Sequence, residues 1–124
     1  MTETRTTIAV VEDDLAVRTA LQQLLRSAAF DTLTFASAEE FLSAGAVERA
    51  DLLIADVNLP GISGPALVQR LAASGSALPA ILITGRDDPA TRQLIRQAGA
   101  VPRLRKPFSD GDLFGAIRAA LSAA

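Results

Sequence analysis

The chain has 124 residues, of which 49% are apolar, and a formal net charge of −2. These values predict one globular domain with a substantial core and argue against disorder. The chain has no cysteine and no histidine, which excludes disulfides, thiol chemistry, phosphohistidine carriers and metals bound by these residues. The remaining metal chemistry is that of hard cations with carboxylate and carbonyl ligands.

Short apolar runs alternate with segments of helical periodicity along the chain. The runs predict strands, and the periodic segments between them predict helices. The strands are expected at 8–11, 32–35, 52–55, 80–84 and 101–105. The helices are expected at 15–28, from Ser37 to Gly45, from Pro65, from Pro89 to Gly99, and from Ser109 onward.

Helix-boundary signals support these segments. Ser37 and Glu40 have the spacing of a capping box, in which the hydroxyl caps the helix and the carboxylate bonds back to the first residue. Pro65 and Pro89 suit the first turn of a helix, because that turn does not use the missing N–H. On the first helix we expect Val17, Leu21, Leu24 and Ala28 to form the apolar face.

Five strand–helix units predict an α/β fold with a parallel sheet covered by helices on both faces. Strands buried on both faces are continuously apolar, which fits 8–11, 52–55 and 80–84 best. The strands at 32–35 and 101–105 fit less well, so we place them at the edges. Pro102 agrees, since a proline in a central strand removes a ladder hydrogen bond. This arrangement is the flavodoxin-like, doubly wound (βα)5 sheet with strand order 2-1-3-4-5.

Polar residues follow the carboxyl ends of four of these strands. Glu12 and Asp13 follow the first, Asp56 ends the third, Thr84 ends the fourth and Lys106 follows the fifth. Strands 1, 3, 4 and 5 are neighbours in the predicted order, so the five side chains should converge on one cleft.

The residue types in that cleft point to phosphoryl chemistry. Crowded carboxylates repel one another unless a cation neutralises them, and Mg²⁺ favours such oxygen ligands. A carboxylate such as Asp56 can attack phosphorus and form an aspartyl phosphate. The Lys106 ammonium and the Thr84 hydroxyl would then stabilise the phosphoryl oxygens.

Each feature alone has an ordinary structural explanation. Asp14 beside the acidic pair fits a helix N-cap, and a strand-ending threonine reflects β propensity. A Lys-Pro pair by itself is an ordinary feature of a surface turn. Only the combination, in the right order on the right strand ends, makes a specific signal.

These motifs give the chain a resemblance to response-regulator receiver domains, the phosphoacceptors of two-component signalling. The resemblance covers residues 1–124 as one domain, and it is nearest to receivers of nitrogen-fixation-type regulators. The motifs are Val10-Val11-Glu12-Asp13-Asp14, Asp56-Val57-Asn58-Leu59-Pro60-Gly61 with Ser63-Gly64, Thr84, Gly99-Ala100 and Lys106-Pro107-Phe108.

The resemblance implies Asp56 as the phosphorylation site with Mg²⁺ as cofactor. Asp13 would bind the metal directly together with Asp56, Glu12 would bind it through water, and the Asn58 main-chain carbonyl would complete the protein ligands.

The resemblance also implies residues that act on the phosphoryl group. Thr84 and Lys106 would contact it, and the side chains of Asn58 and Arg86 would tune its lifetime.

The sequence departs from the family pattern at the strand 101–105. Receivers usually carry a Tyr or Phe three residues before the lysine, and this chain has Arg103 there. They usually carry an Asp directly before that aromatic residue, and this chain has Pro102 there. The chain has no tyrosine. Arg103 is either a solvated edge residue or an electrostatic switch that responds to the added phosphoryl charge. If phosphorylation-dependent partner binding or dimerisation of the Arg103→Ala variant equals that of the wild type, the switch hypothesis is wrong.

The expected function is therefore a cytoplasmic signalling switch rather than a metabolic enzyme, with its own autophosphorylation and autodephosphorylation chemistry. A histidine kinase or histidine phosphotransfer protein would phosphorylate Asp56. A protein partner or second copy would bind the face of the fourth helix, fifth strand and fifth helix. That face would gather late basic residues, because residues 57–124 carry eight basic against four acidic residues. Ordinary surface charge is the simpler explanation of this imbalance.

We expect no membrane segment, no signal peptide and no effector domain within these residues. Direct nucleic-acid binding is not expected either, because no DNA-recognition motif or interleaved aromatic residues accompany the basic residues.

Two other functions compete. A Mg²⁺-dependent phosphohydrolase could use an aspartyl phosphate, but haloacid-dehalogenase-type phosphatases carry two aspartates one residue apart on the first strand. Here the candidate nucleophile, Asp56, is on the third strand, and the residue two positions after it is Asn58 instead of an aspartate. Sustained turnover of phosphate esters would favour this enzyme class. A degenerate receiver could act only as an interaction module, but Asp13, Asp56, Thr84 and Lys106 are all present.

Overall fold

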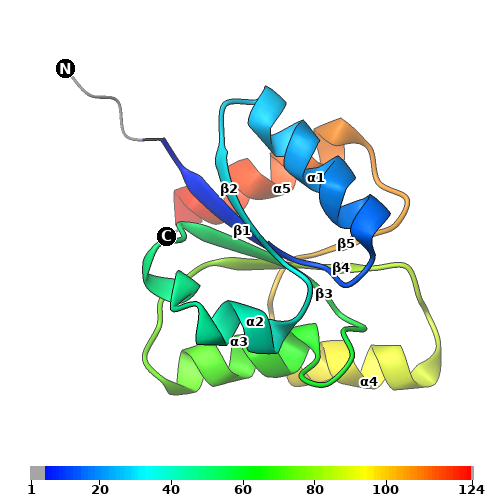
Figure 1. The fold of residues 1–124 in the computed structure, drawn as a ribbon. Helices are drawn as coiled ribbons and strands as arrows, with labels where there is room; N and C mark the ends of the chain where they lie inside the picture. The colour runs from blue at the N-terminus through cyan, green and yellow to red at the C-terminus, as the bar shows by residue number, and fades with distance from the viewer. Residues whose placement is uncertain (1–4, 124) are drawn as a thin grey trace.

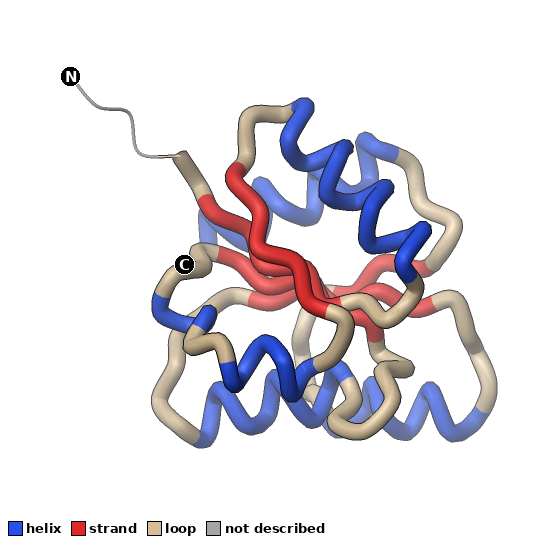
Figure 2. The backbone as a smooth tube through the Cα atoms, viewed as in Figure 1, coloured by secondary structure: helices blue, strands red, loops and turns tan. Residues whose placement is uncertain are grey.

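The computed structural model describes residues 5–123. Residues 1–4, on which the expectation of no signal peptide partly depends, and residue 124 of the predicted domain lie outside the described part. Five parallel strands form one sheet in the order β2-β1-β3-β4-β5, which confirms the predicted fold (Figures 1 and 2). The elements are β1 (Thr7–Val11), α1 (Leu15–Ser27), β2 (Asp31–Phe35), α2 (Ala38–Ser43), η1 (Ala46–Glu48), β3 (Leu52–Asp56), α3 (Gly64–Ala73), β4 (Ala80–Thr84), α4 (Pro89–Gln97), β5 (Arg103–Arg105) and α5 (Asp110–Ala123).

The sheet separates two helical layers, with α1 and α5 on one face and α2, α3 and α4 on the other (Figure 1). Alternate strand residues enter opposite cores, because side chains of a strand point to opposite faces. On β3, for example, Ile54 packs with Leu25 and Ile117, while Leu53 packs with Phe41 and Leu67. Both faces of the central strands are therefore apolar, as their continuous apolar runs predicted.

Side-chain caps begin most of the helices. Ser37 accepts a hydrogen bond from the Glu40 N–H at 3.1 Å, which confirms this cap. The Glu40 carboxylate, however, accepts from the N–H of Ala36 at 2.7 Å rather than from that of Ser37. Asp14 caps α1 by accepting from the Val17 N–H at 3.1 Å, so the ordinary structural role considered for Asp14 is present.

Two further sequence predictions need correction. The last strand is Arg103–Arg105 rather than 101–105, because Pro102 has no N–H to donate, although its carbonyl still accepts from Leu82 N at 2.9 Å. On α1, Ala28 is the exposed C-cap residue, and Leu25, four residues after Leu21, occupies the buried face instead.

Candidate phosphoacceptor site

The carboxyl ends of β1 and β3 place two carboxylates beside one ammonium. Glu12 follows β1 and is fully buried, and Asp56 ends β3 with 8% of its surface exposed. Lys106 follows β5, and its Nζ lies 2.8 Å from Glu12 Oε1 and 3.5 Å from Asp56 Oδ2. Three of the residues expected to converge therefore do so.

An acidic cluster forms around this ion pair. Carboxylate oxygens of Glu12, Asp13 and Asp56 all lie within 4.8 Å of one another, and Asp13 is exposed. Burial, together with the neighbouring Asp56 carboxylate, raises the pKa of Glu12 to about 7, although the hydrogen bond and charge of Lys106 oppose the rise. Three carboxyl groups therefore lie beside one lysine, and crowding them favours the protonated form of Glu12.

The lysine is held in its charged form by the same groups. Burial alone would lower the pKa of the Lys106 ammonium, but the hydrogen bond to Glu12 and the charges of Asp56 and Glu12 outweigh it, so the pKa is raised. Lys106 is therefore a fixed positive charge beside the Asp56 carboxylate.

The acidic cluster has the donor chemistry that a hard divalent cation requires. Its ligand atoms are carboxylate oxygens, and Glu12 Oε2 is buried without a hydrogen-bond partner among residues 5–123. A buried charged oxygen is costly when it lacks a partner. The residues present therefore fit a cation such as Mg²⁺, which binds through one or two carboxylates and retains several waters.

The turn after β3 packs tightly against the aspartate. The N–H of Asn58 donates to Asp56 Oδ1 at 3.1 Å, and the Asn58 amide donates to the buried Thr91 hydroxyl at 3.1 Å. The chain returns at Gly64, whose N–H donates to the Val57 carbonyl at 3.2 Å. A Cβ on Gly64 would overlap the Asp56 carbonyl oxygen and lie 2.9 Å from its carbon. Glycine is thus required where this turn meets β3.

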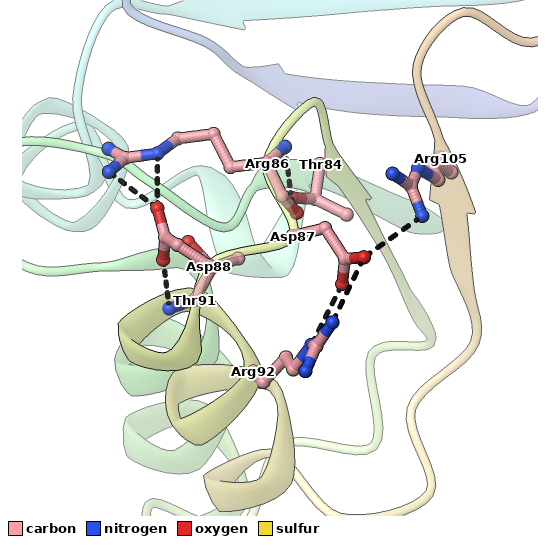
Figure 3. A network of polar contacts seen from close by, with 7 residues as sticks. All are labelled: Thr84, Arg86, Asp87, Asp88, Thr91, Arg92 and Arg105. Atoms are coloured by element: carbon pink, nitrogen blue, oxygen red, sulfur yellow. Dashed lines mark hydrogen bonds and ion pairs between the residues drawn. The ribbon is translucent and has the colours of Figure 1, made fainter.

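Thr84 ends β4 as predicted, but its hydroxyl is bonded to the following loop. It donates to the Arg86 carbonyl at 3.1 Å and accepts from the Arg86 N–H at 3.2 Å (Figure 3). Thr84 is only 4% exposed. In this conformation the hydroxyl therefore holds the loop at Arg86.

A polar network continues from that loop to α4 and β5. The Asp87 carboxylate lies between two arginines, accepting from Arg92 Nε at 2.9 Å and from Arg105 Nη1 at 3.4 Å (Figure 3). Arg86, the predicted tuning residue, is an exposed side chain whose Nη2 lies 2.7 Å from Asp88 Oδ2. Arg103 is exposed, and its side chain forms no ion pair within the described part of the chain.

The Asp88 carboxylate predicts one pH effect. Hydrogen bonds from the backbone and side chain of Thr91, and then one from Arg86, lower the pKa of Asp88 from 3.8 to about 2. A group whose pKa is lowered in the folded state contributes stability at pH values above its unfolded pKa, and this contribution is lost as the pH falls through about 2.

Asp88→Asn keeps the capping oxygen and removes the charge. We expect Asp88→Asn to be less stable than the wild type at pH 6 and the difference to shrink between pH 4 and pH 2, measured by urea unfolding. A constant difference across this range would contradict the assignment.

Three residues of the network were not predicted from the sequence. Asp88 directly precedes Pro89 at the start of α4, so the N-cap signal was present in the sequence. Asp87 and the buried Thr91 have no such capping signal, because Arg105, which shares Asp87 with Arg92, and Asn58, which bonds to Thr91, lie far away in the sequence.

Comparisons with known proteins show which family the chain is similar to. The model of the response regulator receiver domain family matches residues 8–118. Nodulation protein W of Bradyrhizobium diazoefficiens is 38% identical over 117 residues, which cover 94% of this chain and 52% of that protein. Transcriptional regulatory protein FixJ of Azorhizobium caulinodans is 38% identical over 112 residues, which cover 90% of this chain and 53% of that protein. The crystal structure of FixJ-N has a TM-score of 0.84 at 30% identity and covers 98% of both chains.

The chain belongs to the response-regulator receiver family, the signalling switches of two-component systems. Among its relatives are the FixJ regulator and nodulation protein W, which confirms the predicted likeness to nitrogen-fixation-type receivers. The chain spans about half the length of these two relatives.

Response-regulator receivers pair with histidine kinases, which is the class of partner expected from the motifs. The relatives named as transcriptional regulators are longer than this chain, so the expectation of no nucleic-acid contact stays a prediction for these residues alone. Within residues 5–123, no helix is long and apolar enough to cross a membrane.

Proposed function

We propose that the chain is a cytoplasmic phosphoacceptor in which Asp56 receives a phosphoryl group from the phosphohistidine of a histidine kinase or histidine phosphotransfer protein. The observation that carries this proposal is the Asp56 carboxylate beside the Lys106 ammonium, at 3.5 Å, on the edge of an acidic cluster. An Asp56 oxygen forms the new bond to phosphorus, the P–N bond breaks, and the imidazole leaves with the electron pair.

The other residues of the site support this transfer by position and charge. Lys106 keeps its positive charge beside Asp56 and balances the phosphoryl oxygens. Asp13, Asp56 and the Asn58 main-chain carbonyl would hold Mg²⁺, with Glu12 acting through water. When bound, the ion supplies positive charge against the acidic cluster and the phosphoryl oxygens.

The readout of phosphorylation starts at Thr84. Its hydroxyl would exchange the Arg86 carbonyl for a phosphoryl oxygen, which releases the loop at Arg86 and Asp87. The phosphoryl group adds about −1.5 to −2 charges at the sheet end, and Arg103 or the Asp87 ion pairs would respond to them. This shift would favour a protein partner or a second copy on the α4–β5–α5 face. Asn58 and Arg86 would tune the phosphoryl lifetime through the turn after β3 and the loop after β4.

Intact-mass measurement tests the proposed function. After incubation with Mg²⁺ and a small phosphodonor such as acetyl phosphate, the wild type is expected to gain one acid-labile phosphoryl group, whereas Asp56→Asn gains none. Equal labelling of both proteins, or no labelling of the wild type, would overturn the proposal. Removing Mg²⁺ with EDTA is expected to prevent the gain of the phosphoryl group.

A further inference from the structure

A hollow of about 450 Å³ lies between α4 and β5, and no residue of the acidic cluster lines it. Thr84 and Ile95 contribute to its lining, together with a single acidic residue, Asp87. The rest of the lining is basic and consists of Arg86, Arg92, Arg96, Arg103 and Arg105. Five guanidinium groups against one carboxylate give this arginine pocket a strong positive charge.

Two of the five arginines have no acidic partner, and Arg86 lies 2.7 Å from Asp88 beside the pocket. Asp87 is shared between Arg92, at 2.9 Å, and Arg105, at 3.4 Å. Arg96 donates to the neutral Gln93 amide at 3.1 Å. Neither Arg96 nor Arg103 forms an ion pair with any acidic residue between positions 5 and 123. Two guanidinium groups, one from each wall, therefore remain available to an anion.

We propose that the arginine pocket binds a small diphosphate-bearing anion, such as inorganic pyrophosphate or the diphosphate of a nucleotide. The planar guanidinium fork donates paired hydrogen bonds to phosphate oxygens, and arginines on both walls let two phosphates be bound at once. The volume of about 450 Å³ is in the range of small-ligand sites. The anion offers Arg92 and Arg105 an alternative to Asp87, so Asp87 competes with it.

This binding does not require phosphorylation and is tested in the unphosphorylated protein with EDTA, on an Asp56→Asn background. EDTA removes divalent cations that would carry a phosphate to the acidic cluster. Pyrophosphate and ADP are titrated by calorimetry and by NMR of the arginine Nε–H groups. We expect saturable binding of one anion per chain, with shifts at Arg96 and Arg103.

Matched variants locate the site. Arg103→Gln is expected to raise the Kd roughly 10- to 100-fold, because a hydrogen bond to a charged group contributes about 1.5–3 kcal/mol. Arg118→Gln removes the same charge from the exposed surface of α5, outside the pocket, and is expected to leave the Kd within about twofold. Asp87→Asn is expected to tighten binding, since it frees Arg92 and Arg105.

Three results would overturn the proposal. The first is no saturable binding of either probe below 1 mM, on the order of a 4 kcal/mol affinity. The second is equal weakening by Arg103→Gln and Arg118→Gln, which would indicate only diffuse surface charge. The third is binding of a glutamate-rich peptide without binding of pyrophosphate, which would make the groove a docking surface for an acidic protein segment.

Discussion

Lys106→Met is expected to slow Mg²⁺-dependent phosphoryl uptake from a small phosphodonor by about 10²- to 10³-fold, the usual effect of removing one group that stabilises developing oxyanion charge. Lys106 is the positive side chain that contacts both Glu12 and Asp56 in the described residues, at 2.8 and 3.5 Å. Methionine keeps a similar unbranched length and removes the charge. The rate is measured by intact mass at several times after mixing.

The comparison needs a variant that loses a charge elsewhere. Arg70 lies exposed on α3, outside the acidic cluster, so Arg70→Met makes the same change in net charge. It is expected to retain wild-type uptake. If Lys106→Met and Arg70→Met accept phosphoryl groups at equal rates, Lys106 has no electrostatic role in the transfer.

Gly64→Ala is expected to lower both the free energy of unfolding and the rate of phosphoryl uptake. The added Cβ would overlap the Asp56 carbonyl, 2.9 Å from its carbon, and would also meet a Leu82 methyl at 3.2 Å. The Asp56 backbone cannot relieve this overlap by a rotamer change, as a flexible side chain could. Either β3 or the start of α3 must therefore shift. Overpacking of this kind costs about 1–3 kcal/mol, and a displacement of the nucleophile by about 1 Å can cost roughly 10²-fold in rate.

Gly115→Ala is the matched control for this change. Gly115 lies within α5, and a Cβ there meets nothing within 4 Å. Alanine at a helix interior is expected to stabilise by about 0.5–1 kcal/mol. Urea unfolding and intact mass are measured on both variants. Wild-type stability and uptake in Gly64→Ala would show that the Asp56 turn relaxes without cost.

The sheet and the acidic cluster could be predicted because local patterns determine them. Continuous apolar runs identify strands buried on both faces, and a parallel sheet brings the ends of those strands together. Glu12, Asp56 and Lys106 therefore meet although they are far apart in sequence. The capping hydroxyl of Ser37 was predictable for the same reason, since its partner is three residues away.

The bonds made by the loops were not predictable from such patterns. Thr84 bonds to Arg86 because the loop after β4 folds back on itself, and no periodicity describes that. Asp87 could pair with any of several nearby arginines, and only the packing of α4 beside β5 selects Arg92 and Arg105. Side-chain networks between elements depend on tertiary geometry, which strand and helix patterns do not contain.

The unpartnered oxygen of Glu12 implies a trade-off between function and folding. A fully buried carboxylate whose oxygen has no hydrogen-bond partner among residues 5–123 is expected to lower the free energy of unfolding. The chain therefore gives up thermal stability at the place where its acidic residues converge. Any divalent cation that binds only the native state recovers this loss by mass action, so the melting temperature of the protein should follow the free concentration of that cation.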